Sequence, residues 1–288
     1  MSVEERVAGE SYWRIAWRTL RSNPVGMFGL VGFAALVALL LLAPYLAPAD
    51  PTTMDFDHLL EPPSRAHVFG TDDLGRDILS RVLWGGRESL RVALVGVVIA
   101  GLGGTIVGLV SGYYGGWVDA IIMRLVDVML AFPSILLMLS IVAALGPKLS
   151  TVVVAIAISS IPGVGRYVRG SVLAAKNYEY VTAAKVIGGT GRYIMFTQIL
   201  PNIMAPLIIY STVGLGGMIM MTAGLSYIGL GAQPPSPEWG AMLNYGRNYL
   251  RDAWWMSVFP GVAIFVAVLC INLLGDGLRD ALDPKLRT

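Results

Sequence analysis

The side chains that most often carry chemistry are few and widely spaced along this sequence. Its two histidines, His58 and His67, are nine residues apart and have no cysteine nearby; this is weak support for a metal site and is typical of solvated loop positions. Asp127 follows Arg124 in a largely apolar stretch. A carboxylate in such a place can relay protons, whereas an arginine three residues away favours a local ion pair.

The sequence also lacks the residues that bind a nucleotide. A phosphate-binding loop of the pattern G-x-x-x-x-G-K-[ST] needs a lysine after a glycine, but every lysine here follows proline or alanine. These lysines are Lys148, Lys176, Lys185 and Lys285. Paired carboxylates and a nucleophile elbow are absent too, so the sequence does not support an enzyme, a metal site or a cofactor site in this chain.

The composition indicates a membrane protein. Of the 288 residues, 55% are hydrophobic and 14% are charged, whereas soluble domains have about 25% charged residues. A net charge of +2 is too small to indicate a nucleic-acid partner. The single cysteine, Cys270, lies in an apolar run and excludes an internal disulfide. We therefore expect an all-α polytopic protein in a lipid bilayer.

Apolar runs long enough for crossing helices, which need about 20 residues, recur along the chain. We expect six spans, at 25–49, 92–118, 128–147, 149–165, within 193–237, and at 253–275. Prolines at both ends of the fifth run leave one good helix at 207–230. A signal peptide cleaved near 47–49 is the alternative for the first run, which is longer than the usual apolar region of about 7–15 residues.

Positive charge marks the cytoplasmic side of a membrane protein, and it collects at both ends of this chain. The basic residues concerned are Arg6, Arg14, Arg18, Arg21, Arg279, Lys285 and Arg287. The loop between spans four and five is also basic. The loop at 48–91 holds eight acids and five arginines and then lies outside. We expect cytoplasmic N and C termini.

Small residues recur at every fourth position of the second span. They are Gly96, Ala100, Gly104, Gly108, Gly112 and Gly116. Such a stripe lets another helix backbone approach closely, so we expect helix packing at Gly104, Gly108 and Gly112. The spacing does not distinguish packing within the chain from contact with a partner subunit or a moving gate.

A short, partly apolar helix is expected at 178–187, closed by Gly188 and Gly189. Its candidate apolar contacts are Val181, Ala184, Val186 and Ile187. Thr182-Ala183-Ala184, Gly188 and Ile199-Leu200-Pro201 together resemble the EAA loop of ATP-binding-cassette importer permeases. Thr182 stands where that pattern usually has Glu, and Leu200 follows Ile199 directly.

Three other segments resemble the dipeptide and oligopeptide permeases of the C type. They are FGTDDLGRD at 69–77, AFP at 131–133, and LSYIGLG at 225–231 with the proline-rich stretch that ends in Trp239-Gly240. The resemblance covers nearly the whole chain. It implies the type I importer permease fold, with a cytoplasmic segment at 1–24, a first transmembrane helix at 25–47, an extracytoplasmic loop at 48–88, a core at 89–280 with a coupling loop at 166–200, and a tail at 281–288.

The resemblance also implies partners and a role. These are a second homologous permease, two cytoplasmic ATPases that bind ATP and Mg, and an extracytoplasmic substrate-binding protein, in a bacterial or archaeal plasma membrane. The ATPase-coupling residues would be Tyr178, Glu179, Thr182, Ala183, Ala184, Lys185, Gly188 and Pro201. The solute would be a di- or oligopeptide, with glutathione, a nickel chelate or an oligosaccharide as alternatives. An ion-coupled secondary transporter and a membrane scaffold are the rival classes.

The outward segments also have a physical interpretation. Thr71 or Asp72 can cap a helix that begins near Leu74, lies on the outer leaflet, and sets Asp77 beside Arg81. The proline-rich turn at 233–239 either meets a binding protein or links the last two spans. Polar residues that we expect to be available to a pathway are Ser140, Ser159, Ser160, Asn202, Ser211, Thr212, Thr222 and Asn272.

Overall fold

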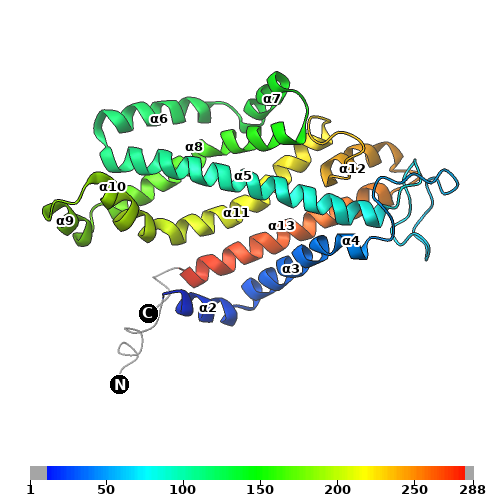
Figure 1. Ribbon diagram of the computed structural model, residues 1–288, viewed down its shortest axis with the longest axis horizontal. Helices are drawn as coiled ribbons and strands as arrows, with labels where there is room; N and C mark the ends of the chain where they lie inside the picture. The colour runs from blue at the N-terminus through cyan, green and yellow to red at the C-terminus, as the bar shows by residue number, and fades with distance from the viewer. Residues whose placement is uncertain (1–11, 283–288) are drawn as a thin grey trace.

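The computed structural model describes residues 12–282, which are helical apart from turns, loops and one isolated β-bridge between Thr71 and Asp77. Arg6, Lys285 and Arg287 lie outside the described residues. The long helices run side by side along the long axis of the molecule (Figure 1).

Six stretches are long and apolar enough to cross a membrane, if one bent pair counts as one span. They are α3 (Pro24–Leu41), α5 (Ile78–Tyr114), α6 (Gly116–Ala131) with α7 (Ser134–Leu145), α8 (Leu149–Ala175), the stretch Gly191–Tyr227, and α13 (Trp255–Leu282). The stretch Gly191–Tyr227 consists of α10 (Gly191–Tyr193), the π-helix η1 (Ile194–Ile199) and α11 (Leu200–Tyr227). The shorter helices are α2 (Tyr12–Ser22), α4 (Ala43–Leu46), α9 (Glu179–Val186), α12 (Trp239–Gly246) and η2 (Arg247–Tyr249). The described residues therefore match the expected all-helical membrane fold.

The second span begins earlier than the sequence suggested, and the separate outer-leaflet helix from Leu74 does not form. Asp72 Oδ1 instead accepts hydrogen bonds from the backbone N–H of Leu74 and Arg76, which closes a turn through Gly75 at φ +71°. The helix starts at Ile78, where the Asp77 side chain accepts from the N–H of Ser80. The result is one continuous helix, α5, of 37 residues.

The third span is broken, and the fourth is longer than expected. A proline disfavours helical geometry in the residue before it, and Phe132 is accordingly extended before Pro133. The axes of α6 and α7 differ by 89° as a result. In contrast, α8 continues to Ala175 rather than ending at Gly165. Arg166 and Arg169, which follow the expected apolar run, lie within α8 and pair with carboxylates of α6.

Gly104, Gly108 and Gly112 of the small-residue stripe face α8 of the same chain, whereas Gly96 faces Met218 of α11 and Gly116 belongs to α6. A Cβ built on Gly108 would lie 2.6 Å from the carbonyl oxygen of Gly165 and 2.6 Å from Cβ of Val168. Gly104 and Gly112 likewise lie against Val164 and Val172. The backbones of α5 and α8 therefore approach so closely that side chains at these positions would overlap.

The two ends of the bundle differ in character. Figure 1 shows α9, α2 and the C-terminal end of α13 at one end, and the loop before α5 together with α12 at the other. The first is here called the α9 end and the second the α12 end. An even number of crossings produces this arrangement, because the chain must return to the end from which it entered.

Replacing Gly108 by Ala should destabilise the protein by about 1–3 kcal/mol, the usual cost of an overpacked interior. The added methyl group would meet the backbone of α8 at Gly165, which cannot turn aside as a flexible side chain could. Gly101→Ala is the matched control, since a Cβ at Gly101 of α5 has no neighbour within 4 Å. Chemical unfolding of the purified protein in nanodiscs measures both. Equal stability of the two variants would contradict the packing role of the stripe.

Candidate functional site

The short helix α9 is a discrete unit with a defined end. Its last turn closes through two hydrogen bonds, from the N–H of Gly188 to the carbonyl of Lys185 and from the N–H of Gly189 to the carbonyl of Ala184. Gly188 has φ +85°, the left-handed conformation that glycine adopts at no steric cost. The chain can therefore stop α9 sharply and turn back into the bundle.

One face of α9 is buried and the other is bare. Val181 and Ala184 are 0% and 6% exposed and lie on the side that packs against η1. The other two candidate apolar contacts, Val186 and Ile187, are 80% and 81% exposed and do not pack within the chain. Five and six residues after Val181, they fall on other sides of a helix with 3.6 residues per turn. Two apolar side chains thus point away from the protein at the α9 end.

Most of the residues expected to couple to an ATPase are accessible at this end. Tyr178, Glu179, Thr182, Ala183, Lys185, Gly188 and Pro201 are exposed, and Ala184 is buried. Nearby contacts tie this segment to the end of α5. The ammonium of Lys185 lies 5.9 Å from the ring centroid of Tyr113, and Lys176 Nζ donates to the carbonyl of Gly112 at 3.1 Å.

Two ion pairs connect α6 to α8 beside the close α5–α8 contact. Both Oδ atoms of Asp119 accept from the guanidinium of Arg169 at 2.6 Å. Asp127 pairs with Arg166 rather than with Arg124, the partner that sequence spacing favoured. Arg166 on the adjacent helix α8 pairs with Asp127 in place of Arg124, which is near in sequence. This pairing depends on how the helices pack and cannot be predicted from sequence spacing. The described residues thus give Asp127 a cationic partner.

A cavity of about 710 Å³ opens between α5, α8, α11 and α13. Of the polar residues expected to be available to a pathway, Ser159, Ser160 and Ser211 line it. Ser140, Asn202 and Thr212 instead donate hydrogen bonds to carbonyls four residues earlier in the chain. The lining is mainly apolar, with hydroxyl groups spread along it.

Sequence reasoning missed the aromatic pair in this cavity. The rings of Tyr167 in α8 and Tyr210 in α11 stack with centroids 4.5 Å apart, and both line the cavity. Asp276 and Arg279 of α13 line it as well. The spacing of three residues between Asp276 and Arg279 places both on one face of the last span, which could have indicated a polar site. From the sequence alone, Arg279 was used only to assign the cytoplasmic side.

The proline-rich turn ends in a buried anchor at the α12 end. Trp239 is 0% exposed, and its indole N–H donates to the carbonyl of Val82 at 2.8 Å. Glu238 is also fully buried, caps α12 through the N–H groups of Gly240 and Ala241, and accepts from Ser89 Oγ. This part of the turn therefore links spans five and six by fastening α12 onto α5.

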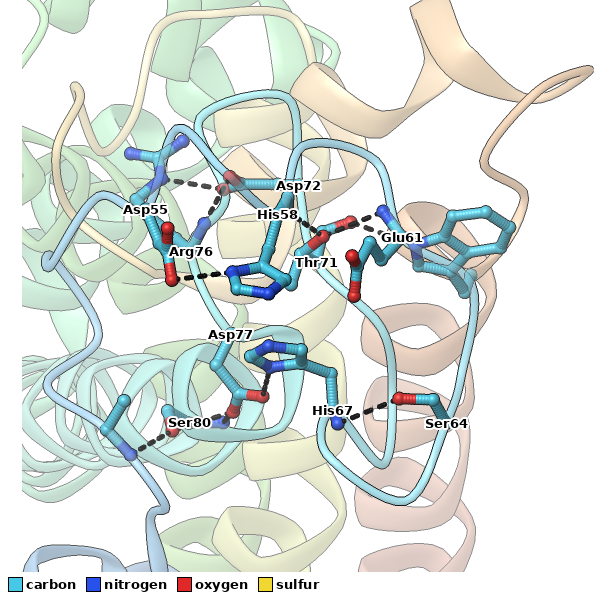
Figure 2. Close-up of polar contacts among 12 residues, drawn as sticks. Asp55, His58, Glu61, Ser64, His67, Thr71, Asp72, Arg76, Asp77 and Ser80 are labelled. Atoms are coloured by element: carbon cyan, nitrogen blue, oxygen red, sulfur yellow. Dashed lines mark hydrogen bonds and ion pairs between the residues drawn. The ribbon is translucent and has the colours of Figure 1, made fainter.

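The loop before α5 is held by buried and exposed polar contacts, shown in Figure 2. His58 Nδ1 lies 2.9 Å from Asp55, and His67 Nδ1 lies 3.2 Å from Asp77. Each histidine has its own carboxylate, and no group of three or more His, Cys, Asp or Glu able to hold a metal ion occurs within residues 12–282. Both histidines therefore hold the loop before α5 in place through these contacts.

Comparison with known proteins identifies relatives over the full length. Residues 104–288 match the family described as "Binding-protein-dependent transport system inner membrane component". Residues 11–63 match the "N-terminal TM domain of oligopeptide transport permease C". Together the two matches cover the first span and everything from the middle of α5 onward.

Individual relatives carry different solute names at similar identity. The chain is 44% identical to a dipeptide transport system permease protein of Alkalihalophilus pseudofirmus, over 99% of this chain and 94% of the relative. It is 46% identical to a glutathione transport system permease protein of Pectobacterium atrosepticum, over 96% and 92%. It is 45% identical to a probable D,D-dipeptide transport system permease protein of Escherichia coli K12, over 94% and 91%.

Asp55→Asn should lower the pKa of His58. The hydrogen bond that Asp55 accepts from His58 holds the pKa of His58 above the ordinary 6.5 and holds the pKa of Asp55 below 3.8. The ion pair therefore steadies the loop most between these two values. Its contribution fades as the pH rises through the raised histidine pKa or falls through the lowered carboxylate pKa.

An NMR pH titration of histidine-labelled protein in nanodiscs measures this effect. The His58 resonance is assigned by its loss in His58→Gln. Asp57→Asn is the matched control, because Asp57 raises the pKa of His58 less than Asp55 and Glu61 do. An unchanged His58 midpoint in Asp55→Asn would contradict the pairing.

Proposed function

This chain belongs to the family of binding-protein-dependent transport system inner membrane components, and we propose that it forms half of the translocation pathway of an ATP-driven importer of di- and oligopeptides. The family makes it a non-catalytic permease of the di/oligopeptide type in the inner membrane, and no cofactor is expected in the chain. Membership also implies partner ATPases and a binding protein.

The observation that carries the coupling proposal is the exposed apolar pair on α9. Val186 and Ile187 are each about four-fifths exposed on a helix whose opposite face is buried. Exposed apolar side chains rimmed by polar residues typically mark a protein contact. Within the expected coupling segment at 166–200, we assign α9 and the exposed residues named above to contact with a cytoplasmic ATPase. The α9 end is then cytoplasmic, as are the segments at 1–24 and 281–288.

Coupling follows from how α9 is attached. The helix follows the end of α8 after a short turn, and Lys185 and Lys176 contact the end of α5. Closure of the ATPases upon ATP binding would displace α9 as a lever, and the tightly packed α5–α8 pair would carry the motion toward the α12 end. Spans three to six then tilt, the pathway opens outward, and hydrolysis resets the inward state.

The cavity of about 710 Å³ supports a half-pathway in this subunit. Its apolar wall with scattered hydroxyl groups can pass a peptide without binding any one side chain tightly. The cavity is open, so a second homologous permease would complete the wall. The α12 end, including the loop at 48–88, would face the extracytoplasmic binding protein.

Small peptides are the proposed solutes, and glutathione is the second candidate. Relatives named for dipeptides and for glutathione are about equally similar to this chain. Glutathione is itself a tripeptide, so both fit a pathway built for short peptide backbones. Uptake of a labelled dipeptide into proteoliposomes, with glutathione as competitor, distinguishes them. Uptake that needs an ion gradient and persists without ATP would overturn the importer assignment.

Val186→Asp combined with Ile187→Asp should abolish solute-stimulated ATP hydrolysis in the assembled complex, with a loss of at least about tenfold, as for a buried interface anchor. The fold should persist, because both side chains are exposed. Leu250→Asp is the control, an equivalent change at an apolar residue that is 54% exposed and follows η2.

Gly188→Leu is a second, independent variant, because its effect comes through the left-handed backbone rather than through a lost contact. A Cβ at Gly188 has no neighbour within 4 Å inside the chain. If solute-stimulated hydrolysis and uptake both stay normal in both variants, the coupling assignment is wrong.

Gly217→Phe should reduce peptide uptake to background by obstructing the pathway. Gly217 lines the cavity, and a Cβ there meets no atom within 4 Å, so the ring has room to enter without disturbing the helix. Gly224→Phe is the matched control on the same helix, with the same free space but outside the cavity lining. Initial uptake rates in proteoliposomes measure both. Equal uptake by the two variants would place the pathway elsewhere.

A further inference from the structure

A second, smaller cavity lies at the α12 end and shares no lining residue with the main cavity. Its volume is about 70 Å³, and the loop before α5 and the segment from Ser226 to Tyr245 form its wall. The polar side chains that line it are Arg76, Arg81, Ser226, Gln233, Ser236, Asn244 and Tyr245. The lining includes two arginines and no carboxylate.

Two buried arginine charges share a single carboxylate at ion-pair distance. Arg76 and Arg81 are 4% and 6% exposed. Asp72 accepts from Arg76 Nε at 2.6 Å and lies 3.6 Å from Arg81 Nε (Figure 2 shows the Arg76 contact). Asp72 is the one carboxylate within ion-pair distance of either guanidinium in the part of the chain that the structure describes. Asp73 next to it accepts from the hydroxyl of Tyr249 instead.

Hydrogen-bond donors around this cavity are left unused. Arg81 Nη1 donates to the carbonyl of Pro51 at 2.8 Å. The guanidinium of Arg76 lies 5.9 Å from the ring centroid of Tyr245, and its terminal nitrogens donate no hydrogen bond within residues 12–282. The hydroxyl groups of Ser236 and Tyr245 also have no hydrogen-bond partner there. The N–H groups of a buried guanidinium normally donate hydrogen bonds to acceptors. An acceptor that enters from outside would complete the set.

From these contacts we propose that the cavity binds a carboxylate group between Arg76 and Arg81, with Tyr245 and Ser236 as further donors. The guanidinium fork matches a carboxylate in geometry as well as in charge. The size agrees, since a cavity of about 150 Å³ holds a benzene-sized molecule and this one is about half as large. A single carboxylate fits, whereas a whole dipeptide does not.

The carboxylate has two sources of the same chemistry. One is the C-terminal carboxylate of a peptide solute, and the other is an acidic side chain of the docked binding protein. The inference rests on the proposed function for this choice of sources and for the side of the membrane. The site itself rests on the cavity and its arginines.

Acetate is the probe for the site, measured by saturation-transfer NMR on the assembled complex in nanodiscs at constant ionic strength. Acetate should bind and neutral acetamide should not. Arg76→Gln should weaken acetate binding at least about tenfold, the usual loss for a charge-assisted hydrogen bond. Arg65→Gln is the matched control, because Arg65 is an exposed arginine of the same loop that does not line the cavity.

Tyr245→Phe keeps the test decisive if Arg76→Gln disturbs the loop. This variant leaves the Asp72–Arg76 pair in place and removes one hydroxyl donor, so acetate binding should weaken about threefold. No acetate signal in the wild-type complex, or equal signals in all variants, overturns the proposal and leaves the arginines with a structural role alone.

Competition identifies the source of the carboxylate. Displacement of acetate by alanyl-alanine but not by its C-terminal amide supports the solute. Displacement by the binding protein but not by the dipeptide supports an acidic side chain of that protein. Displacement by neither means an adventitious ion only and overturns the proposal. ATP-driven uptake by the same preparations separates the outcomes, because uptake without acetate binding refutes this site and acetate binding without uptake refutes the importer.

Discussion

The close approach of α5 and α8 is the contact on which the rest of the bundle depends. Glycines on both helices, Gly104 and Gly108 facing Gly165, bring backbone against backbone. In lipid there is little hydrophobic drive to join helices, so such close packing is a main source of association. Because α5 is continuous from Ile78 to Tyr114, this contact aligns the α12 end with the α9 end. Motion of α8 cannot leave α5 unmoved.

The charges of the bundle follow from the same packing. Asp119 and Asp127 lie in an apolar helix, where an unpaired charge would be costly. Arg169 and Arg166 of α8 lie opposite them, so α6 is held to the helix that α5 already holds. The basic residues that sequence reasoning had assigned to a cytoplasmic loop therefore have a second role inside the extended α8. Arg166 and Arg169 thus contribute positive charge that marks the cytoplasmic side, and they also form ion pairs that hold α6 to α8.

The number of spans could be predicted from the sequence, because the need for a long apolar run is local. The helix stop at Gly188 could be predicted for the same reason. Where prediction failed, side-chain contacts that the local pattern does not contain decided the structure. Asp72 and Asp77 are both acceptable helix caps, and the choice of Asp77 depends on Asp72 being held by Arg76 and Arg81. The outward direction of Val186 depends on which face of α9 meets η1, which no local pattern contains.

The two ends of the molecule are built for opposite tasks. At the α12 end, Trp239 and Glu238 are fully buried against α5, and a Cβ on Gly85 would meet the backbone of Pro237 at 1.9 Å. No residue of the loop before α5 or of α12 lines the main cavity, which instead extends along α13 to Asp276 and Arg279. The α12 end is thus fastened while the cavity continues toward the α9 end, where apolar side chains stay bare. In the proposed mechanism, opening the cavity toward α12 moves segments that are fastened to α5, and the force is applied at the α9 end.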